Sequence, residues 1–170
     1  INSNIIGVDI KEIDIEKKKL NGKNIKIYKG SQTDINFIQE IIREYKKFDV
    51  IIDDGSHYPK DVIKSFNLLF PHLNFEGLYF VEDMQTSYNH YFYGDAFNLK
   101  YSKTHMNFFK HLTDSLNYQN IANPFYKKNK YDGEIKNISF FNNIVIIKKG
   151  LNNKKSNLLI NNSFEQKRYN

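Results

Sequence analysis

Short apolar runs alternate with longer amphipathic stretches through the first half of the chain. Each apolar run has the length of a buried strand, and the predicted strands cover residues 4–9, 25–28, 48–52 and 78–81. The stretches between them repeat apolar residues at helical spacing, and the predicted helices cover residues 11–20, 35–45 and 62–69. Asp34 is the expected N-cap of the second helix. Because the crossovers are too long for hairpins, this order predicts a parallel sheet with helices on both faces.

The second half of the chain closes the predicted sheet. Its predicted elements are a loop, a helix and the two strands of an antiparallel hairpin, at residues 88–100, 104–116, 135–141 and 144–147. Glu76–Gly77 is expected to turn the chain into the fourth strand. We therefore expect an α/β, Rossmann-like domain over residues 1–150 and a polar tail over residues 151–170.

Composition excludes several classes of protein. At 170 residues with 40% hydrophobic and 26% charged residues, the chain has ordinary globular values and the length of one domain. It has no cysteine, which excludes disulfides and thiolate metal sites. No apolar run approaches the ~18–20 residues of a membrane span, so we expect a cytoplasmic protein. The net charge of +6 comes from scattered lysines, which favours a solvated surface over a nucleic-acid site.

Acidic residues follow two of the predicted strands. Asp53 and Asp54 end the third strand, Glu82 and Asp83 end the fourth, and His57 lies shortly after Asp54. The carboxyl ends of parallel strands meet at one sheet edge, where ligands bind. Clustered carboxylates repel one another unless a cation or a proton neutralises them. The pattern indicates a metal-assisted active site, although the paired aspartates could also be turn or capping residues and His57 a polar residue at a helix start.

Sequence blocks in this order are typical of a known family. The most specific blocks are DVIIDDGSH at 49–57 and VED at 81–83 followed by TSY at 86–88, with support from 7–10, 30–34 and 138–141. Together they resemble class I S-adenosylmethionine-dependent methyltransferases, and specifically the metal-dependent sugar O-methyltransferases of the macrocin and mycinamicin type. The resemblance implies methyl transfer from S-adenosylmethionine to a hydroxyl of a sugar or glycosylated metabolite, in polysaccharide or natural-product biosynthesis.

The resemblance also implies roles for single residues. The implied ligands of a magnesium ion are Asp54, Glu82 and Asp83, which offer the oxygen donors that this hard cation prefers. His57 is implied as the base that accepts the hydroxyl proton. The residues implied to bind the cofactor are Asp9, Ser31, Gln32 and Asp53, although Asp9 could also be a simple turn residue. Apart from the resemblance, Tyr88 and His90 could contact the acceptor, or Tyr88 could be an ordinary packing residue and His90 a surface histidine. Relatives of this kind often form oligomers, so a homo-oligomer is among the expected assemblies.

One part of the family pattern is missing from this chain. The first strand of the family's sheet and its Gly-rich loop would precede the strand that ends at Asp9. Without them, we expect a gap between the strands ending at Asp9 and Asp53. The sequence is then either an N-terminally truncated fragment or a degenerate copy. A hydroxylase-like metal-dependent relative and a non-catalytic module remain the alternative functions.

Overall fold

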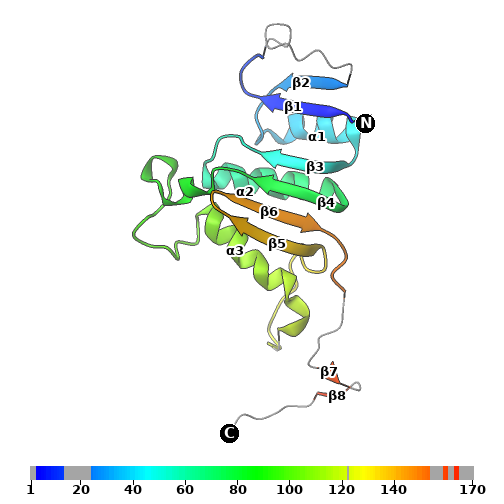
Figure 1. Ribbon diagram of the computed structural model, residues 1–170, viewed down its shortest axis with the longest axis vertical. Helices are drawn as coiled ribbons and strands as arrows, with labels where there is room; N and C mark the ends of the chain where they lie inside the picture. Colours follow the sequence, from blue (N-terminus) through cyan, green and yellow to red (C-terminus); the bar gives the residue numbers. More distant parts are fainter. Residues whose placement is uncertain (1–2, 14–23, 122, 154–158, 161–162, 165–170) are drawn as a thin grey trace.

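The strands form separate sheets in the computed structural model, which describes residues 3–13, 24–121, 123–153, 159–160 and 163–164 (Figure 1). A parallel pair joins β1 (Ile5–Asp9) to β2 (Ile25–Lys29). The main sheet has four strands in the order β3 (Phe48–Asp53), β4 (Leu73–Val81), β6 (Ile144–Lys149) and β5 (Ile135–Phe141). Within it, β3 and β4 are parallel, and β6 is antiparallel to both of its neighbours, so the predicted hairpin is confirmed.

The predicted gap in the sheet is also present. Among the described residues, β1 pairs only with β2, and no hydrogen-bonded ladder joins β1 to β3. Further along the chain, β7 (Leu159–Ile160) and β8 (Ser163–Phe164) form a short antiparallel pair.

Three α-helices follow the predicted pattern. They are α1 (Ile35–Tyr45), α2 (Pro59–Leu69) and α3 (His105–Leu116), with 3₁₀ turns η1 (Phe70–His72), η2 (Met84–Tyr88), η3 (His90–Phe92) and η4 (Tyr118–Asn120). The carboxylate of Asp34 accepts the N–H groups of Asn36 and Phe37, which confirms the predicted N-cap. Thr104 caps α3 in the same way, through the N–H of Asn107. No helix in the described part of the chain is long and apolar enough to cross a membrane.

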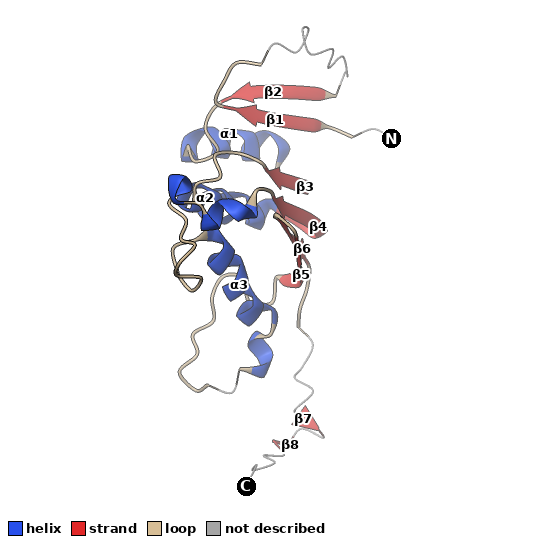
Figure 2. Cartoon of the chain, turned by 60° about the vertical axis from the view of Figure 1, so that its left-hand side comes forward, coloured by secondary structure: helices blue, strands red, loops and turns tan. Residues whose placement is uncertain are grey.

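The core lies between the main sheet and the helices. Phe66 of α2 is fully buried, and its ring lies 4.8 Å from that of Phe70, 4.9 Å from Tyr79 and 5.2 Å from Phe109. Figure 2 shows all three α-helices on one side of the strands. In β3, Val50 is 53% and Ile52 is 61% exposed, whereas Ile51 between them is partly buried against the core.

Within the described residues the helices therefore cover one face of the sheet, and the predicted cover of the other face is not tested there. Most of the helix predicted at 11–20 lies outside the described residues, and residues 11–13 are not helical.

Two local predictions need correction. Strand β4 begins at Leu73, so Glu76–Gly77 is an irregularity inside the strand and not a turn before it. The register shifts there, with Phe48 opposite Leu73 but Val50 opposite Leu78. Glu76 has a φ of 67°, and a side chain at Gly77 would crowd the backbone of Asn74 and Asp49, so the chain kinks at these two residues. In the predicted loop at 88–100, residues 90–92 form the turn η3.

Candidate active site

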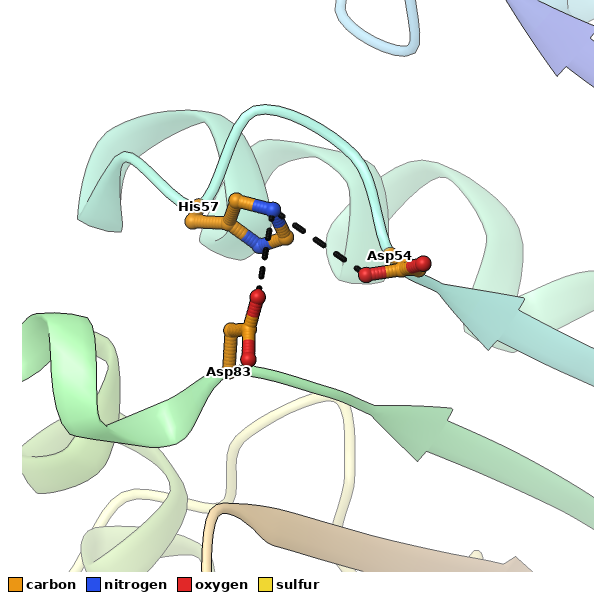
Figure 3. Close-up of side chains that lie close together, drawn as sticks. All are labelled: Asp54, His57 and Asp83. Atoms are coloured by element: carbon orange, nitrogen blue, oxygen red, sulfur yellow. Dashed lines mark ion pairs between the residues drawn. The ribbon is translucent and has the colours of Figure 1, made fainter.

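Three ionisable side chains meet at the carboxyl edge of the main sheet. Asp54 follows β3, Asp83 lies two residues after β4, and His57 lies in the loop between β3 and α2 (Figure 3). The register places Asp53 opposite Val81, so the two strands end level with each other. Nε2 of His57 lies 3.5 Å from Oδ2 of Asp83 and 4.0 Å from Oδ1 of Asp54, and one donor atom from each residue lies within 4.8 Å of the others. The structure therefore brings these three predicted residues together, and their roles as metal ligands and base stay predictions.

Two of the three residues have an unusual backbone. His57 has a φ of 58° and Asp83 a φ of 52°, both in the left-handed region. This conformation costs an L-residue about 1–2 kcal/mol relative to the right-handed one, and it persists only where neighbouring contacts hold it. The sharp turn at each residue brings the imidazole and the carboxylate toward the same point (Figure 3).

Like charges make this arrangement suited to a cation. The side chain of Asp54 is 62% exposed and that of Asp83 is 45% exposed, whereas His57 is only 21% exposed. One carboxylate oxygen of Asp54 lies within 4.8 Å of one of Asp83. For scale, two like unit charges ~4 Å apart repel by ~1 kcal/mol in bulk water and by ~4 kcal/mol at the effective dielectric near a protein surface. A divalent cation between them would convert this repulsion into attraction, and carboxylate oxygens with water molecules are the ligands that Mg²⁺ prefers.

Glu82 is not brought into this cluster. Its backbone N–H donates to the carbonyl of Asp53, which ties the two strand ends together, but its carboxylate is not among the clustered donor atoms of the described residues. Its assignment as a metal ligand stays a prediction.

Asp53 lies beneath the site. It is only 7% exposed, and burial raises the pKa of its carboxyl, while hydrogen bonds from Ser65 and Gln32 act in the opposite direction. Nε2 of Gln32 donates to one carboxylate oxygen at 3.0 Å, and the hydroxyl of Tyr79 lies 3.5 Å from the other.

Gln32 connects the two sheets through the same contact. Its Oε1 accepts the N–H of Ser56 at 2.8 Å, so the amide binds the end of β3 through Asp53 and the loop that carries His57 through Ser56. A side chain at Gly55 would overlap the Gln32 amide, which explains a glycine there. Both polar atoms of Gln32 are directed at the protein, and the cofactor roles of Gln32 and Asp53 stay predictions.

The remaining predicted cofactor residues lie on the parallel pair of strands. Asp9 ends β1, half-buried, and its Oδ1 accepts the N–H of Lys11 at 2.8 Å. Ser31 follows β2, and its Oγ lies 3.0 Å from the Thr33 hydroxyl. The N–H of Gly30 donates to the carbonyl of Asp9, so the carboxyl ends of β1 and β2 lie side by side. They point to the same side of the molecule as the carboxyl ends of β3 and β4, where the acid cluster lies (Figure 1). Their roles stay predictions.

Aromatic residues border the cluster on one side. The ring of Phe92 lies 6.3 Å from the His57 ring and 5.6 Å from that of Tyr58, and Tyr58 lies 5.7 Å from Tyr93. Tyr93 is 73% exposed. The predicted acceptor contacts Tyr88 and His90 are both exposed, whereas Phe92 and Tyr58 were not predicted to lie at the site. No periodic signal marks them, because they come from a loop and a 3₁₀ turn.

A buried polar group behind the cluster was also missed. Thr86, Ser87 and His105 are 6%, 1% and 0% exposed. Nε2 of His105 lies 3.1 Å from Oγ of Ser87, and burial, with the nearby charge of His57, lowers the pKa of His105 to about 4. The TSY block marked these residues as part of a motif, but nothing in the sequence placed His105 beside them.

A hollow elsewhere on the surface is unrelated to this chemistry. It has a volume of about 170 Å³ and lies at the amino ends of β1 and β2, lined by Asn4, Ile5, Ile6, Asn24, Lys26 and Tyr45. The acid cluster lies at the opposite, carboxyl edge of the strands.

Comparison with known proteins identifies relatives of the chain. No family model matches it. Mycinamicin VI 2''-O-methyltransferase of Micromonospora griseorubida is 35% identical over 149 residues, covering 87% of this chain and 36% of that protein. Demethylmacrocin O-methyltransferase of Streptomyces fradiae is 34% identical over 149 residues, covering 87% and 37%.

A solved structure agrees with these relatives. MycE methyltransferase from the mycinamycin biosynthetic pathway, in complex with Mg and SAH, matches with a TM-score of 0.81 and 32% identity, covering 93% of this chain and 41% of its own. The chain thus spans little more than a third of the length of the curated relatives it matches. The chain is therefore a homologue of the macrocin- and mycinamicin-type sugar O-methyltransferases and has the class I methyltransferase fold that its motifs predict.

Proposed function

We propose that this chain supplies the catalytic site of an S-adenosylmethionine-dependent, magnesium-assisted O-methyltransferase that acts on a hydroxyl of a sugar or glycoside. The observation that carries the proposal is the cluster of Asp54, His57 and Asp83 at the carboxyl edge of the sheet. Homologues named as sugar O-methyltransferases and a structural neighbour in complex with Mg and SAH support it.

The described residues fit a hard cation at this edge. Asp54 and Asp83 offer two carboxylates whose mutual repulsion a divalent ion would relieve, and both remain open to water molecules and an incoming hydroxyl. Bound there, magnesium would lower the pKa of a coordinated sugar hydroxyl. Glu82 follows β4 directly and is proposed as a further ligand.

His57 is proposed to accept the proton of that hydroxyl. Its ring faces the space between the two carboxylates, so Nε2 of His57 would be near a sugar hydroxyl held in that space (Figure 3). The methyl group would come from S-adenosylmethionine, for which the proposed binding residues, at or just after the adjacent strand ends, are Asp9, Ser31, Gln32 and Asp53.

The aromatic border is proposed to receive the acceptor. Phe92 lies against His57, and Tyr93 projects beside it with most of its ring exposed. An aromatic face offers a sugar ring an apolar contact without competing for its hydroxyls. A sugar held on this border would present a hydroxyl to the cluster.

Substitution of the acid cluster tests the proposal. We expect Asp54→Asn and Asp83→Asn to lose methyl transfer to a panel of glycosides at least a hundredfold at limiting magnesium, with partial recovery at high magnesium. Asp114→Asn, an exposed acid on α3, is the matched control and should retain full activity. Full activity in both cluster variants would refute the proposed site. A product that gains oxygen, and not a methylene group, would indicate a hydroxylase.

A further inference from the structure

One hydroxyl group contacts both loops of the proposed site. Oγ1 of Thr86 lies 2.7 Å from the carbonyl oxygen of Asp83 and 3.2 Å from that of His57. The first contact is local, three residues back along η2, whereas the second spans 29 residues. A hydroxyl has one proton to donate, so the two carbonyls share it in a bifurcated hydrogen bond.

The two carbonyls belong to the two residues with left-handed backbones. His57 and Asp83 carry the side chains that approach to 3.5 Å, and their unusual φ angles need neighbouring contacts to hold them. Thr86 provides such a contact at both positions. Since its hydroxyl binds backbone atoms and not the reacting side chains, its effect on the site is indirect.

Contacts between its neighbour Ser87 and α3 fix the position of Thr86. Thr86 is 6% and its neighbour Ser87 is 1% exposed, so water does not compete for these groups. Oγ of Ser87 accepts the N–H of Met106 at 3.0 Å and lies 3.1 Å from Nε2 of His105. These contacts anchor η2 on the first turn of α3, and the anchored turn presents the Thr86 hydroxyl to the two site loops.

We propose that Thr86 is a positioning residue that sets the separation of His57 and Asp83 by holding their backbone carbonyls on one hydroxyl. This role rests on the proposed function of the cluster as a cation site. Residues that orient metal ligands from behind typically change metal affinity by ~10–100-fold when they are replaced. Loss of the hydroxyl should therefore weaken cation binding although Thr86 touches no cation.

Three variants of the full chain distinguish the effect of the Thr86 hydroxyl from the effect of side-chain shape. Thr86→Val keeps the shape of the side chain and removes the hydroxyl, and Thr86→Ser keeps the hydroxyl. Thr113→Val is the matched control, because Thr113 makes the same local hydroxyl contact three residues back, to Lys110 at 2.7 Å, on an exposed face of α3. If the valine variant does not fold, Thr86→Ala removes the hydroxyl without crowding and takes its place.

Two measurements test the positioning role of Thr86. Binding of Mn²⁺ alone, followed by electron paramagnetic resonance, should weaken about tenfold or more in Thr86→Val and stay within about twofold of the original chain in Thr86→Ser and Thr113→Val. Without added metal, amide hydrogen exchange at residues 54–58 and 83–87 should speed up only in the variant that lacks the Thr86 hydroxyl.

The outcomes distinguish this proposal from the one on which it rests. Unchanged Mn²⁺ affinity and exchange in a folded Thr86→Val or Thr86→Ala chain would overturn the positioning role and leave the cation site standing. If Thr86→Ser bound Mn²⁺ as weakly as Thr86→Val, the positioning role would also be overturned. The shape of the side chain, and not its hydroxyl, would then determine the Mn²⁺ affinity. An original chain that binds no Mn²⁺ would overturn the proposed cation site, and with it the role of Thr86.

Discussion

His105 should make the stability of this protein depend on pH. The imidazole is fully buried at the first residue of α3, behind η2, and burial together with the charge of His57 lowers its pKa to about 4 from an ordinary value of 6.5. The amino end of a helix disfavours a cation as well. Among the described residues, Nδ1 of His105 has no hydrogen-bond partner, so nothing there stabilises a second proton.

The sign and size of the effect follow from linkage. Between pH 4 and 6.5 the unfolded chain binds a proton at this histidine that the folded chain does not, so the free energy of unfolding rises with pH across this window. The stability is fully present above pH 6.5 and is lost as pH falls toward 4. At 1.36 kcal/mol for each tenfold change in proton affinity, the loss is about 3 kcal/mol, a large fraction of the stability of a small domain.

His105→Gln isolates this contribution. Glutamine places a polar group near the position of Nε2, toward Ser87, but does not titrate. Asp53, whose pKa burial raises, acts in the opposite direction over the acidic range, but it is present in both proteins and cancels in the difference. His111→Gln on the exposed side of the same helix is the control.

Urea unfolding followed by circular dichroism at several pH values between 4 and 7.5 measures the effect. From pH 7 to pH 4 the original chain should lose about 3 kcal/mol more than His105→Gln, and His111→Gln should follow the original chain. Parallel pH profiles for the original chain and His105→Gln would refute the reasoning, because the histidine would then titrate alike in the folded and unfolded states.

Two further predictions concern the core and the acceptor side of the site. Phe66→Ala should destabilise the fold by about 3–5 kcal/mol, because Phe66 is fully buried against Phe70, Tyr79 and Phe109; a loss below 1 kcal/mol in urea unfolding would show that the core is loosely packed. Phe92→Ala should raise the KM for the glycoside with little change in Mn²⁺ affinity, and an unchanged KM in steady-state assays would exclude this ring from the acceptor site.

The site was predicted best for residues whose proximity follows from the pairing of neighbouring strands. Asp54 and Asp83 follow parallel neighbouring strands, so their proximity follows from strand pairing alone, and His57 is close to Asp54 in the chain. The gap beside β1 was predicted from the resemblance, because the first strand of the family's sheet has no counterpart in the given sequence. Relatives now support the methyltransferase family, whereas a homo-oligomer, a cytoplasmic location and the absence of nucleic-acid binding stay predictions.

Features that depend on tertiary contacts could not be predicted from the sequence. The kink at Glu76 looked like a turn, because glycine serves equally in turns and in strand irregularities. The hydrogen bonds of the Gln32 amide to Asp53 and Ser56 also had no signal in the sequence, and its predicted cofactor contact stays a prediction. His105 precedes a helical apolar stripe and carries no pattern of its own, so only the packing of α3 against η2 reveals its burial.

The most direct test of the central claim is the magnesium dependence of methyl transfer by the full chain. Incubation with S-adenosylmethionine and a panel of glycosides, followed by mass spectrometry of the products, should show a sugar that has gained one methylene group. We predict that a chelator abolishes this product and that added magnesium restores it. A methylated product formed equally well in the presence of the chelator would contradict a cation site at Asp54 and Asp83.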